Sequence, residues 1–239
     1  MAKPILLLTA TISPGGMINT ARADPAQRTA DYLAALTKWV DDGPCDHLVL
    51  CESSSAPESI FAGLQERARQ RGRILEYHSF QQDFPAHLGK GYGDTGIMGH
   101  ALAHSPALQS ASVILKATGR YWVANAGKLL EQAVAEPAAI ICDLRAYLTE
   151  ADCRWFAVTP HFLRTYLLPR REQCNDSTGV FMEHVLAQAI HAAMADGLRW
   201  RLPRTLSQVE GIGGTRQKRI RTSVSKHLRH AVKRSVIAY

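Results

Sequence analysis

Short apolar runs alternate with amphipathic segments along the first third of the chain, as strands and helices do when they follow one another. Three of these runs have the length and composition of buried strands, and they span residues 4–11, 46–51 and 73–80. Helices are predicted between them at residues 25–40 and 58–71, and Asp24 and Pro25 suit the N-cap and first position of the first helix. The order β-α-β-α-β predicts parallel strands joined by right-handed crossovers.

The same alternation continues through most of the remaining chain. Further buried strands are predicted at residues 112–115, 138–142 and 155–159. Helices are predicted at residues 97–104, 126–135, 160–168 and 180–195, and loops at residues 89–96 and 169–175. We therefore expect an α/β fold with a mostly parallel central sheet flanked by helices, in one domain of residues 1–215 followed by a basic tail, residues 216–239.

The composition is that of an ordinary globular protein, with 239 residues, 46% hydrophobic and 21% charged. The apolar run at residues 5–8 is too short to span a bilayer or to act as a signal peptide, so we expect no secretion. Five scattered cysteines form no CxxC pair. Their pattern argues against a disulfide framework or a structural zinc site and favours a reducing compartment.

The net charge of +7 is concentrated in the tail, because no acidic residue follows Glu210. Without eight basic residues of the tail, the 28 basic residues fall to 20, against 21 acidic ones. The eight are Arg216, Lys218, Arg219, Arg221, Lys226, Arg229, Lys233 and Arg234. A near-neutral body argues against nucleic-acid binding by the whole domain.

Residues 116–125, KATGRYWVAN, follow a buried apolar run and bring charge to the end of a core strand. Ligands of open α/β sheets bind at the carboxyl ends of strands. Lys116, as a point charge, and Arg120, as a planar fork, suit a phosphate or diphosphate. Gly119 and Tyr121 complete this candidate donor site. In the alternative interpretation, Arg120 pairs with a core carboxylate and Gly119 only turns the chain.

Other predicted strand ends carry polar side chains toward the same edge of the sheet. The first run ends beside Thr9, a donor-site candidate, and the second leads into Glu52, a candidate catalytic carboxylate. A later strand delivers Asp143 and Arg145, candidates for the catalytic and donor sites respectively. Asp143 either binds a divalent cation or forms an ion pair with Arg145 or Arg120.

Residues 89–96 contain four glycines in eight positions, just before a predicted helix. Such a loop lets backbone approach a ligand closely, and a helix N-terminus favours anions. The alternative is a flexible connection. The donor-binding candidates here are Lys90, Gly91, Tyr92 and Gly93, and the candidate catalytic carboxylate is Asp94.

Two more charged residues lie in the first turns of predicted helices. Arg28 either is solvated or faces the same cleft as the end of the first strand. Glu183 is either a general base or a favourable charge at a helix N-terminus, and its neighbour His184 carries little weight.

The tail from Gln217 onward has the pattern of a basic amphipathic helix. Apolar residues recur at every fourth position, at Ile220, Val224, Leu228, Val232 and Val236. Such a helix either lies on an anionic membrane surface or docks on the body with its basic face solvated.

Several motifs occur together in residues 4–215, and in combination they resemble glycosyltransferases of bacterial capsule and O-antigen gene clusters. The motifs are Asp24-Pro25 with Arg28 and Tyr32, Glu52-Ser53-Ser54, Lys90-Gly91-Tyr92-Gly93-Asp94, Lys116-Ala117-Thr118-Gly119-Arg120-Tyr121 with Asn125, and Gly211-Ile212-Gly213-Gly214. The resemblance implies a Rossmann-like, glycosyltransferase A-like single domain that uses an activated sugar with a phosphate leaving group. Relatives carry Glu where this chain has Asp94, which keeps the charge but has a shorter reach.

We therefore predict transfer of a sugar from a phosphate-activated donor, such as a nucleotide sugar, to a capsule or lipopolysaccharide O-antigen chain or its lipid-linked precursor. Cations stabilise the leaving phosphate, and a carboxylate deprotonates the acceptor hydroxyl. The chain has no DxD pair, so cationic side chains replace a divalent metal or Asp143 binds Mg²⁺ or Mn²⁺. The expected location is cytoplasmic, at the inner face of the membrane.

Two other classes of protein fit the same sequence features. The first is another phosphate-handling transferase, such as a phosphosugar transferase with a phosphoribosyl donor or a nucleotidyltransferase. The second is a nucleic-acid-binding module driven by the tail, against which the near-neutral body and the lack of aromatic residues interleaved in the tail both count.

Overall fold

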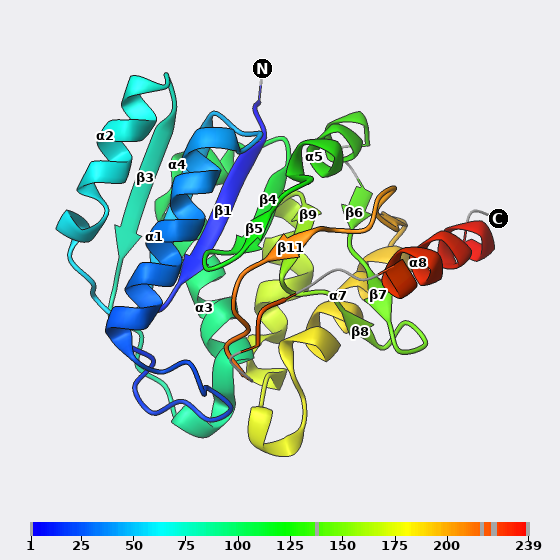
Figure 1. Ribbon diagram of the computed structural model, residues 1–239. Helices are drawn as coiled ribbons and strands as arrows, with labels where there is room; N and C mark the ends of the chain where they lie inside the picture. The colour runs from blue at the N-terminus through cyan, green and yellow to red at the C-terminus, as the bar shows by residue number, and fades with distance from the viewer. Residues whose placement is uncertain (1, 137–138, 216–217, 221–223, 238–239) are drawn as a thin grey trace.

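A computed structural model describes residues 2–136, 139–215, 218–220 and 224–237. A seven-stranded sheet forms its centre, in the order β10-β6-β9-β4-β1-β2-β3 (Figure 1). The strands are β1 (Ile5–Ala10), β2 (His47–Glu52), β3 (Ile74–Ser79), β4 (Ile114–Thr118), β6 (Ala139–Ile141), β9 (Trp155–Val158) and β10 (Arg199–Arg201). All neighbours pair in parallel except β9, which runs antiparallel to β4 and to β6. The predicted mostly parallel α/β sheet is confirmed.

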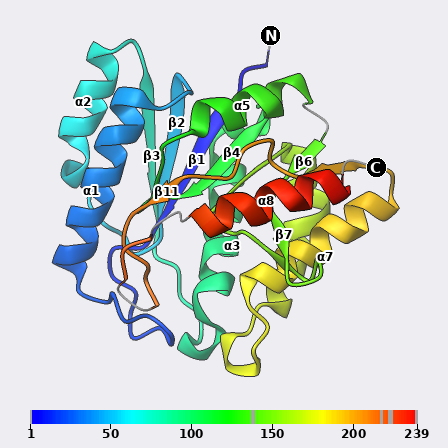
Figure 2. The same cartoon turned by 45° about the vertical axis from the view of Figure 1, so that its right-hand side comes forward.

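Helices cover both faces of the sheet (Figures 1 and 2). One face carries α1 (Pro25–Asp42), α2 (Ala62–Gln70) and α5 (Ala126–Ala135), and the other carries α3 (Gly89–His104), α4 (Pro106–Gln109) and α7 (Met182–Ala195). Side chains of a strand alternate between the two faces. In β1, Leu6 and Leu8 enter the core under α1, whereas Leu7 enters the core under α3.

The remaining elements are short connections between these layers, apart from the helix near the C-terminus. The helical ones are the 3₁₀ turns Glu58–Ile60, Ala86–Leu88 and Asp176–Thr178, α6 (Pro160–Phe162), the π-helical turn Leu163–Leu167, the 3₁₀ helix Leu168–Gln173 and the tail helix α8 (Val224–Ile237). The extended ones are the antiparallel pairs β5 (Trp122–Val123) with β11 (Val209–Glu210) and β7 (Leu144–Arg145) with β8 (Glu150–Ala151). In the part of the chain that the structure describes, no helix is both long and apolar enough to cross a membrane.

The glycine-rich segment 89–96 is not a loop, contrary to the sequence prediction, but forms the first two turns of α3. Other segments of the protein pack so closely against this helix that larger side chains would clash. A Cβ atom at Gly91 would lie 2.9 Å from the backbone nitrogen of Met182, whereas one at Gly96 would displace the flexible end of the Gln82 side chain, whose Nε2 would be 1.9 Å away. Close packing of the protein against this helix therefore accounts for these glycines.

Three other element boundaries differ from prediction or confirm it. Strand β4 runs to Thr118, three residues beyond the predicted end, so Lys116 lies inside the strand. The predicted loop at 169–175 is mostly 3₁₀ helix. The predicted start of α1 is confirmed, since the Asp24 carboxylate accepts a 2.7 Å hydrogen bond from the backbone N–H of Gln27. The predicted domain boundary at residue 216, and the tail cations Arg216 and Arg221, lie outside the described residues.

Candidate functional site

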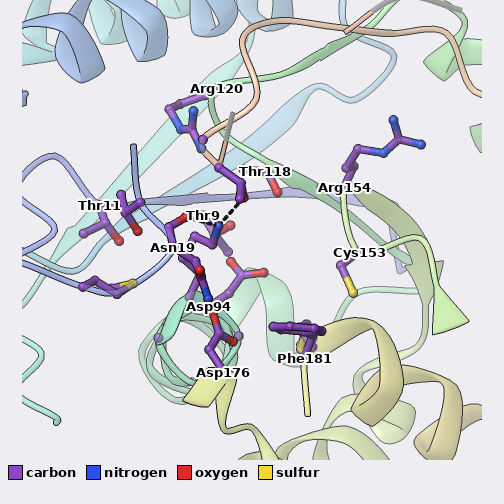
Figure 3. A pocket seen from close by; sticks show the side chains of 18 of the residues that line it. Thr9, Thr11, Asn19, Asp94, Thr118, Arg120, Cys153, Arg154, Asp176 and Phe181 are labelled. Carbon is purple, nitrogen blue, oxygen red and sulfur yellow. Dashed lines mark hydrogen bonds between the residues drawn. The ribbon is translucent and has the colours of Figure 1, made fainter. Parts of the chain in front are cut away.

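A cavity of about 550 Å³ lies at the edge of the sheet where β1 and β4 end. Its walls come from these two strand ends, from α1 and α3, and from residues 145–154 and 176–184. Because β9 is antiparallel, the residues that precede it lie at this same edge. Charged side chains of both signs line the cavity: Arg28, Lys90, Arg120, Arg145, Arg154, Asp94, Glu150, Asp176 and Glu183. Arg120 and Arg154 lie on one side of it and Asp94 and Asp176 on the other (Figure 3).

Arg120 lies in the turn that follows β4. The backbone N–H of Gly119 donates to the carbonyl of Thr9 over 2.9 Å, and a Cβ atom at Gly119 would lie 2.9 Å from that same oxygen. On the other side of the turn, the indole N–H of Trp39 donates a 2.7 Å hydrogen bond to the carbonyl of Tyr121. Glycine is thus required for the close approach that aims Arg120 at the cavity.

Two buried polar atoms in the cavity wall lack a hydrogen-bond partner. Arg120 is only 7% exposed; its Nη1 donates to the carbonyl of Ile212 over 3.0 Å, but its Nε has no partner. The hydroxyl oxygen of Thr9, which is 2% exposed, also has none. Buried polar groups are nearly always satisfied. An unsatisfied donor and an unsatisfied hydroxyl in one cavity wall therefore indicate a polar ligand.

Lys90 lies in the first turn of α3 and lines the cavity. Its ammonium donates to the carbonyl of Asn19 at 2.7 Å and to the hydroxyl of Thr215 at 2.5 Å. Burial lowers the pKa of Lys90; the carboxylates of Asp176 and Glu183 oppose this effect, and the charges of Arg120 and Arg28 add to it. An anion bound among these cations would relieve both the desolvation and the repulsion.

Arg28, from α1, is more fully engaged than Arg120. Its guanidinium donates to the carbonyls of Thr11 at 2.6 Å and Arg22 at 2.9 Å, and to the hydroxyl of Tyr32 at 3.2 Å. Burial lowers the pKa of Arg28, and the nearby charge of Arg120 adds to this effect. Arg28 thus holds the loop after β1 in place and adds positive potential to the cavity.

Lys116 does not reach the cavity. It is fully buried, and its ammonium donates to Oδ2 of Asp94 at 2.5 Å and to the carbonyl of Cys153 at 3.2 Å. The ammonium also faces the Phe156 ring, 5.7 Å from its centroid. Lys116 therefore neutralises and orients the Asp94 carboxylate from behind the cavity wall.

Three carboxylates face the cavity from the side of α3 and α7. Asp94 is 21% exposed and is held by Lys116. Asp176 is buried beside Asn19, and burial raises the pKa of its carboxyl group. Glu183 is exposed to the cavity, yet the surrounding protein desolvates it and raises the pKa of its carboxyl group. All three carboxylates line the cavity.

Glu52 lies outside the cavity. It is fully buried, and its carboxylate accepts 2.9 Å hydrogen bonds from the backbone N–H groups of Ile12, Ser54 and Ala56. The Ser54 hydroxyl also donates to it. Glu52 thus joins the loops that follow β1 and β2.

Asp143 is held by cations from two directions. Its Oδ1 accepts a 2.5 Å hydrogen bond from Lys233 of α8, and its Oδ2 lies 3.3 Å from Nε of Arg145. This confirms the predicted ion pair with Arg145. Among the described residues, no group of three or more His, Cys, Asp or Glu side chains is arranged to hold a metal ion.

The structure brings most of the predicted site residues together. Those that line the cavity are Thr9, Arg28, Lys90, Gly91, Gly93, Asp94, Arg120, Tyr121, Arg145 and Glu183. Those among the predicted residues that do not are Glu52, Tyr92, Lys116, Gly119 and Asp143. The Tyr92 hydroxyl donates to Glu172 at 3.0 Å, and the Arg171 guanidinium stacks 3.9 Å from the centroid of its ring.

Sequence reasoning missed several residues that line the cavity. Arg154 directly precedes β9, and only knowledge that this strand is antiparallel would place Arg154 at the ligand edge. Thr215 belongs to the second glycine-rich segment. A Cβ atom at Gly214, in the same segment, would lie 2.8 Å from Nη2 of Arg120. Gly214 belongs to the Gly211-Ile212-Gly213-Gly214 motif of the sequence, which was the available signal.

No protein-family model matches the sequence, and no curated protein matches it significantly. Solved structures that are similar in fold include the following three. A cytidylyltransferase from Leptospira borgpetersenii is 11% identical, with 93% of this chain and 82% of that chain covered and a TM-score of 0.46. A glycosyltransferase involved in the glycosylation of the major capsid of PBCV-1 is 12% identical, with coverages of 85% and 84% and a TM-score of 0.48. A 4-diphosphocytidyl-2C-methyl-D-erythritol synthase from Anaerococcus prevotii is 10% identical, with coverages of 97% and 96% and a TM-score of 0.41. Similarity at this level does not indicate a shared reaction.

Proposed function

We propose that this protein is a glycosyltransferase that moves a sugar from a nucleotide-sugar donor to a growing bacterial surface polysaccharide or its lipid-linked precursor. The observation that supports a phosphate-activated donor is the unsatisfied Nε of buried Arg120, beside the unsatisfied hydroxyl of Thr9. A diphosphate supplies acceptor oxygens for both groups. Its negative charge offsets the electrostatic repulsion that Arg28 and Arg120 exert on Lys90. The polysaccharide acceptor follows from the resemblance of the sequence motifs alone.

The proposed reaction uses the two sides of the cavity for different tasks. A carboxylate, Asp94 or Glu183, takes the proton from the acceptor hydroxyl while its oxygen attacks the anomeric carbon of the donor sugar. The bond from that carbon to the phosphate oxygen breaks, and the electron pair leaves with the nucleoside diphosphate. Arg120 and Lys90 stabilise the charge that develops on the leaving group.

None of these steps uses a divalent metal. The Asp143 carboxylate, the predicted metal ligand, has both oxygens occupied by basic side chains. The described carboxylates in the cavity form no cluster with ligand spacing. Asp143 is therefore unsuited to bind a metal ion in this arrangement, and we assign no step to one.

A ligand panel followed by product analysis tests the proposal. Nucleotides, nucleotide sugars and phosphoribosyl donors are each added with and without Mg²⁺ or Mn²⁺, and a native-state ligand raises Tm by mass action. A nucleotide sugar that raises Tm, and that releases nucleoside diphosphate with an acceptor, supports glycosyl transfer. Release of pyrophosphate from a nucleoside triphosphate would make the protein a nucleotidyltransferase instead. If only a phosphoribosyl donor raises Tm, the nucleotide-sugar assignment is overturned.

The role of Arg120 is tested by Arg120→Lys, which keeps the charge but loses the planar fork. We expect affinity for the donor to fall by about tenfold or more, since charge-assisted bidentate hydrogen bonds are worth about 1.5–3 kcal/mol. Arg73→Lys is the matched control, because Arg73 also donates to backbone carbonyls, of Trp39 and Val40, but lies outside the cavity. Equal donor affinities of the two variants would contradict the assignment.

A further inference from the structure

Helix α8 docks on the body through polar side chains. His230 is buried and its ring contacts the carbonyl of Pro203 at 2.9 Å. Lys233 donates to the Asp143 carboxylate and to the carbonyl of Leu144, and Arg234 donates to the carbonyl of Arg204 at 2.5 Å. Figure 2 shows α8 lying across the molecule beside β7, to which Leu144 belongs.

The apolar stripe of the same helix points away from the body. Leu228, Val232 and Val236 are 64%, 62% and 69% exposed. At about 100° per residue these three positions share one face of the helix, roughly opposite His230 and Arg234. An amphipathic helix that merely covered the body would bury its apolar face. The helix is docked, as in the second sequence interpretation, and the basic side chain of Arg229 is exposed, but the apolar stripe is exposed as well.

Basic side chains flank the apolar stripe. Arg229 is exposed on one flank of the helix. On the other flank, a groove of about 670 Å³ separates α8 from α5 and is lined by Lys128, Arg204 and Arg234. Among the described residues that line this groove, Glu131 is the one carboxylate. An exposed apolar stripe with positive charge on both sides matches the physical layers of an anionic lipid surface, acyl chains in the middle and phosphates around them.

We propose that α8 is a membrane-docking surface: Leu228, Val232 and Val236 insert among the acyl chains of an anionic bilayer while the flanking basic groove receives lipid phosphates. Charge favours an anionic bilayer over a second copy of the chain as the partner of this surface. A second α8 would bring its own cations, from a tail without any acidic residue, against those of the first. The inference rests on the placement of α8 and not on the proposed sugar transfer.

The experiment is co-sedimentation of the full chain with vesicles. We expect the protein to bind vesicles of phosphatidylglycerol mixed with phosphatidylcholine, and to bind pure phosphatidylcholine only weakly. Leu228→Ser with Val232→Ser should lower the partition coefficient about tenfold or more. Lys128→Gln with Arg229→Gln should lower it about fivefold or more at low salt, and this difference should shrink as salt rises.

A matched control removes exposed apolar side chains elsewhere. Ile74→Ser with Met194→Ser changes side chains that are 55% and 42% exposed on β3 and α7, and it should bind vesicles like the unaltered chain. Equal vesicle binding by the Leu228 and Val232 double variant and the unaltered chain would overturn the proposal. So would self-association in solution, seen by light scattering, that the double variant abolishes, because the occupant would then be a second copy. Turnover with a water-soluble acceptor should not change in the double variant, so failure of this inference is distinguishable from failure of the proposed chemistry.

Discussion

Strands β2 and β4, which lie on either side of β1, both carry buried charge at the same edge of the sheet, and they use it differently. At the end of β2, the Glu52 carboxylate accepts hydrogen bonds from three backbone N–H groups. Beyond the end of β4, Arg120 is nearly as buried, but its Nε has no partner. Burial of a charge therefore does not identify a binding site by itself. The unsatisfied Nε separates Arg120 from Glu52 only because Arg120 lines the cavity, since the indole N–H of Trp155 is also buried without a partner but lies outside it.

The largest expected effect is the loss of Glu52. Glu52→Ala leaves three buried backbone donors unsatisfied, so we expect the free energy of unfolding to fall by about 3–5 kcal/mol. Urea-induced unfolding measures the change. Donor affinity of the protein that remains folded should be unaltered, because Glu52 does not line the cavity. A loss below about 1 kcal/mol would mean that these hydrogen bonds are not what stabilises the loops.

The Lys116–Asp94 pair stands between these two cases, since one partner is fully buried and the other faces the cavity. Asp94→Ala leaves Lys116 as an uncompensated buried charge, and we expect it to cost about 2–4 kcal/mol. Adding Lys116→Met should recover most of that stability, because the burial penalty disappears with the charge.

Stability and turnover should separate in this pair of variants. If Asp94 acts as the base, the stable double variant remains inactive, whereas a purely structural pair would regain activity with stability. A double variant as unstable as the sum of its two single variants would show that Lys116 and Asp94 do not interact energetically.

Much of the fold and part of the site follow from local sequence pattern. Apolar runs of strand length gave the parallel strands β1, β2, β3 and β4, and turn chemistry at Asp24 placed the start of α1. Thr9 and Arg120 follow from the rule that ligands bind where parallel strands end. These predictions depend only on neighbouring residues and on strand direction within β-α-β units.

The errors arise where distant segments decide the structure. The local sequence around the glycines of α3 suggests a loop. Their packing instead depends on Met182 and Gln82, which belong to other segments of the chain. Arg154 joins the site because β9 runs antiparallel, which its own sequence does not encode. The saturation of Glu52 by backbone donors likewise depends on two loops meeting.

The smallest expected effect is that of Glu183, the cavity counterpart of Glu52. Desolvation raises the pKa of Glu183 in the folded state, so the native protein binds a proton more tightly than the unfolded chain does. Stability is therefore lost as pH rises from the unfolded pKa to the folded pKa, and the full cost is present above the folded value. Glu183→Gln cannot ionise, so it should raise Tm at neutral pH, by at most about 2 °C for such an accessible group.

Scanning Tm from about pH 4 to pH 8 measures this difference, which should vanish below the ordinary carboxyl pKa of about 4.3. A Tm difference that stays constant with pH would assign the effect to packing instead of ionisation. The contrast with Glu52 is in the sign: removing a carboxylate that three backbone N–H groups satisfy destabilises the protein, whereas neutralising one that burial desolvates stabilises it. If Glu183→Gln also lowers turnover, the protein retains a destabilising charge in its cavity because the reaction uses it.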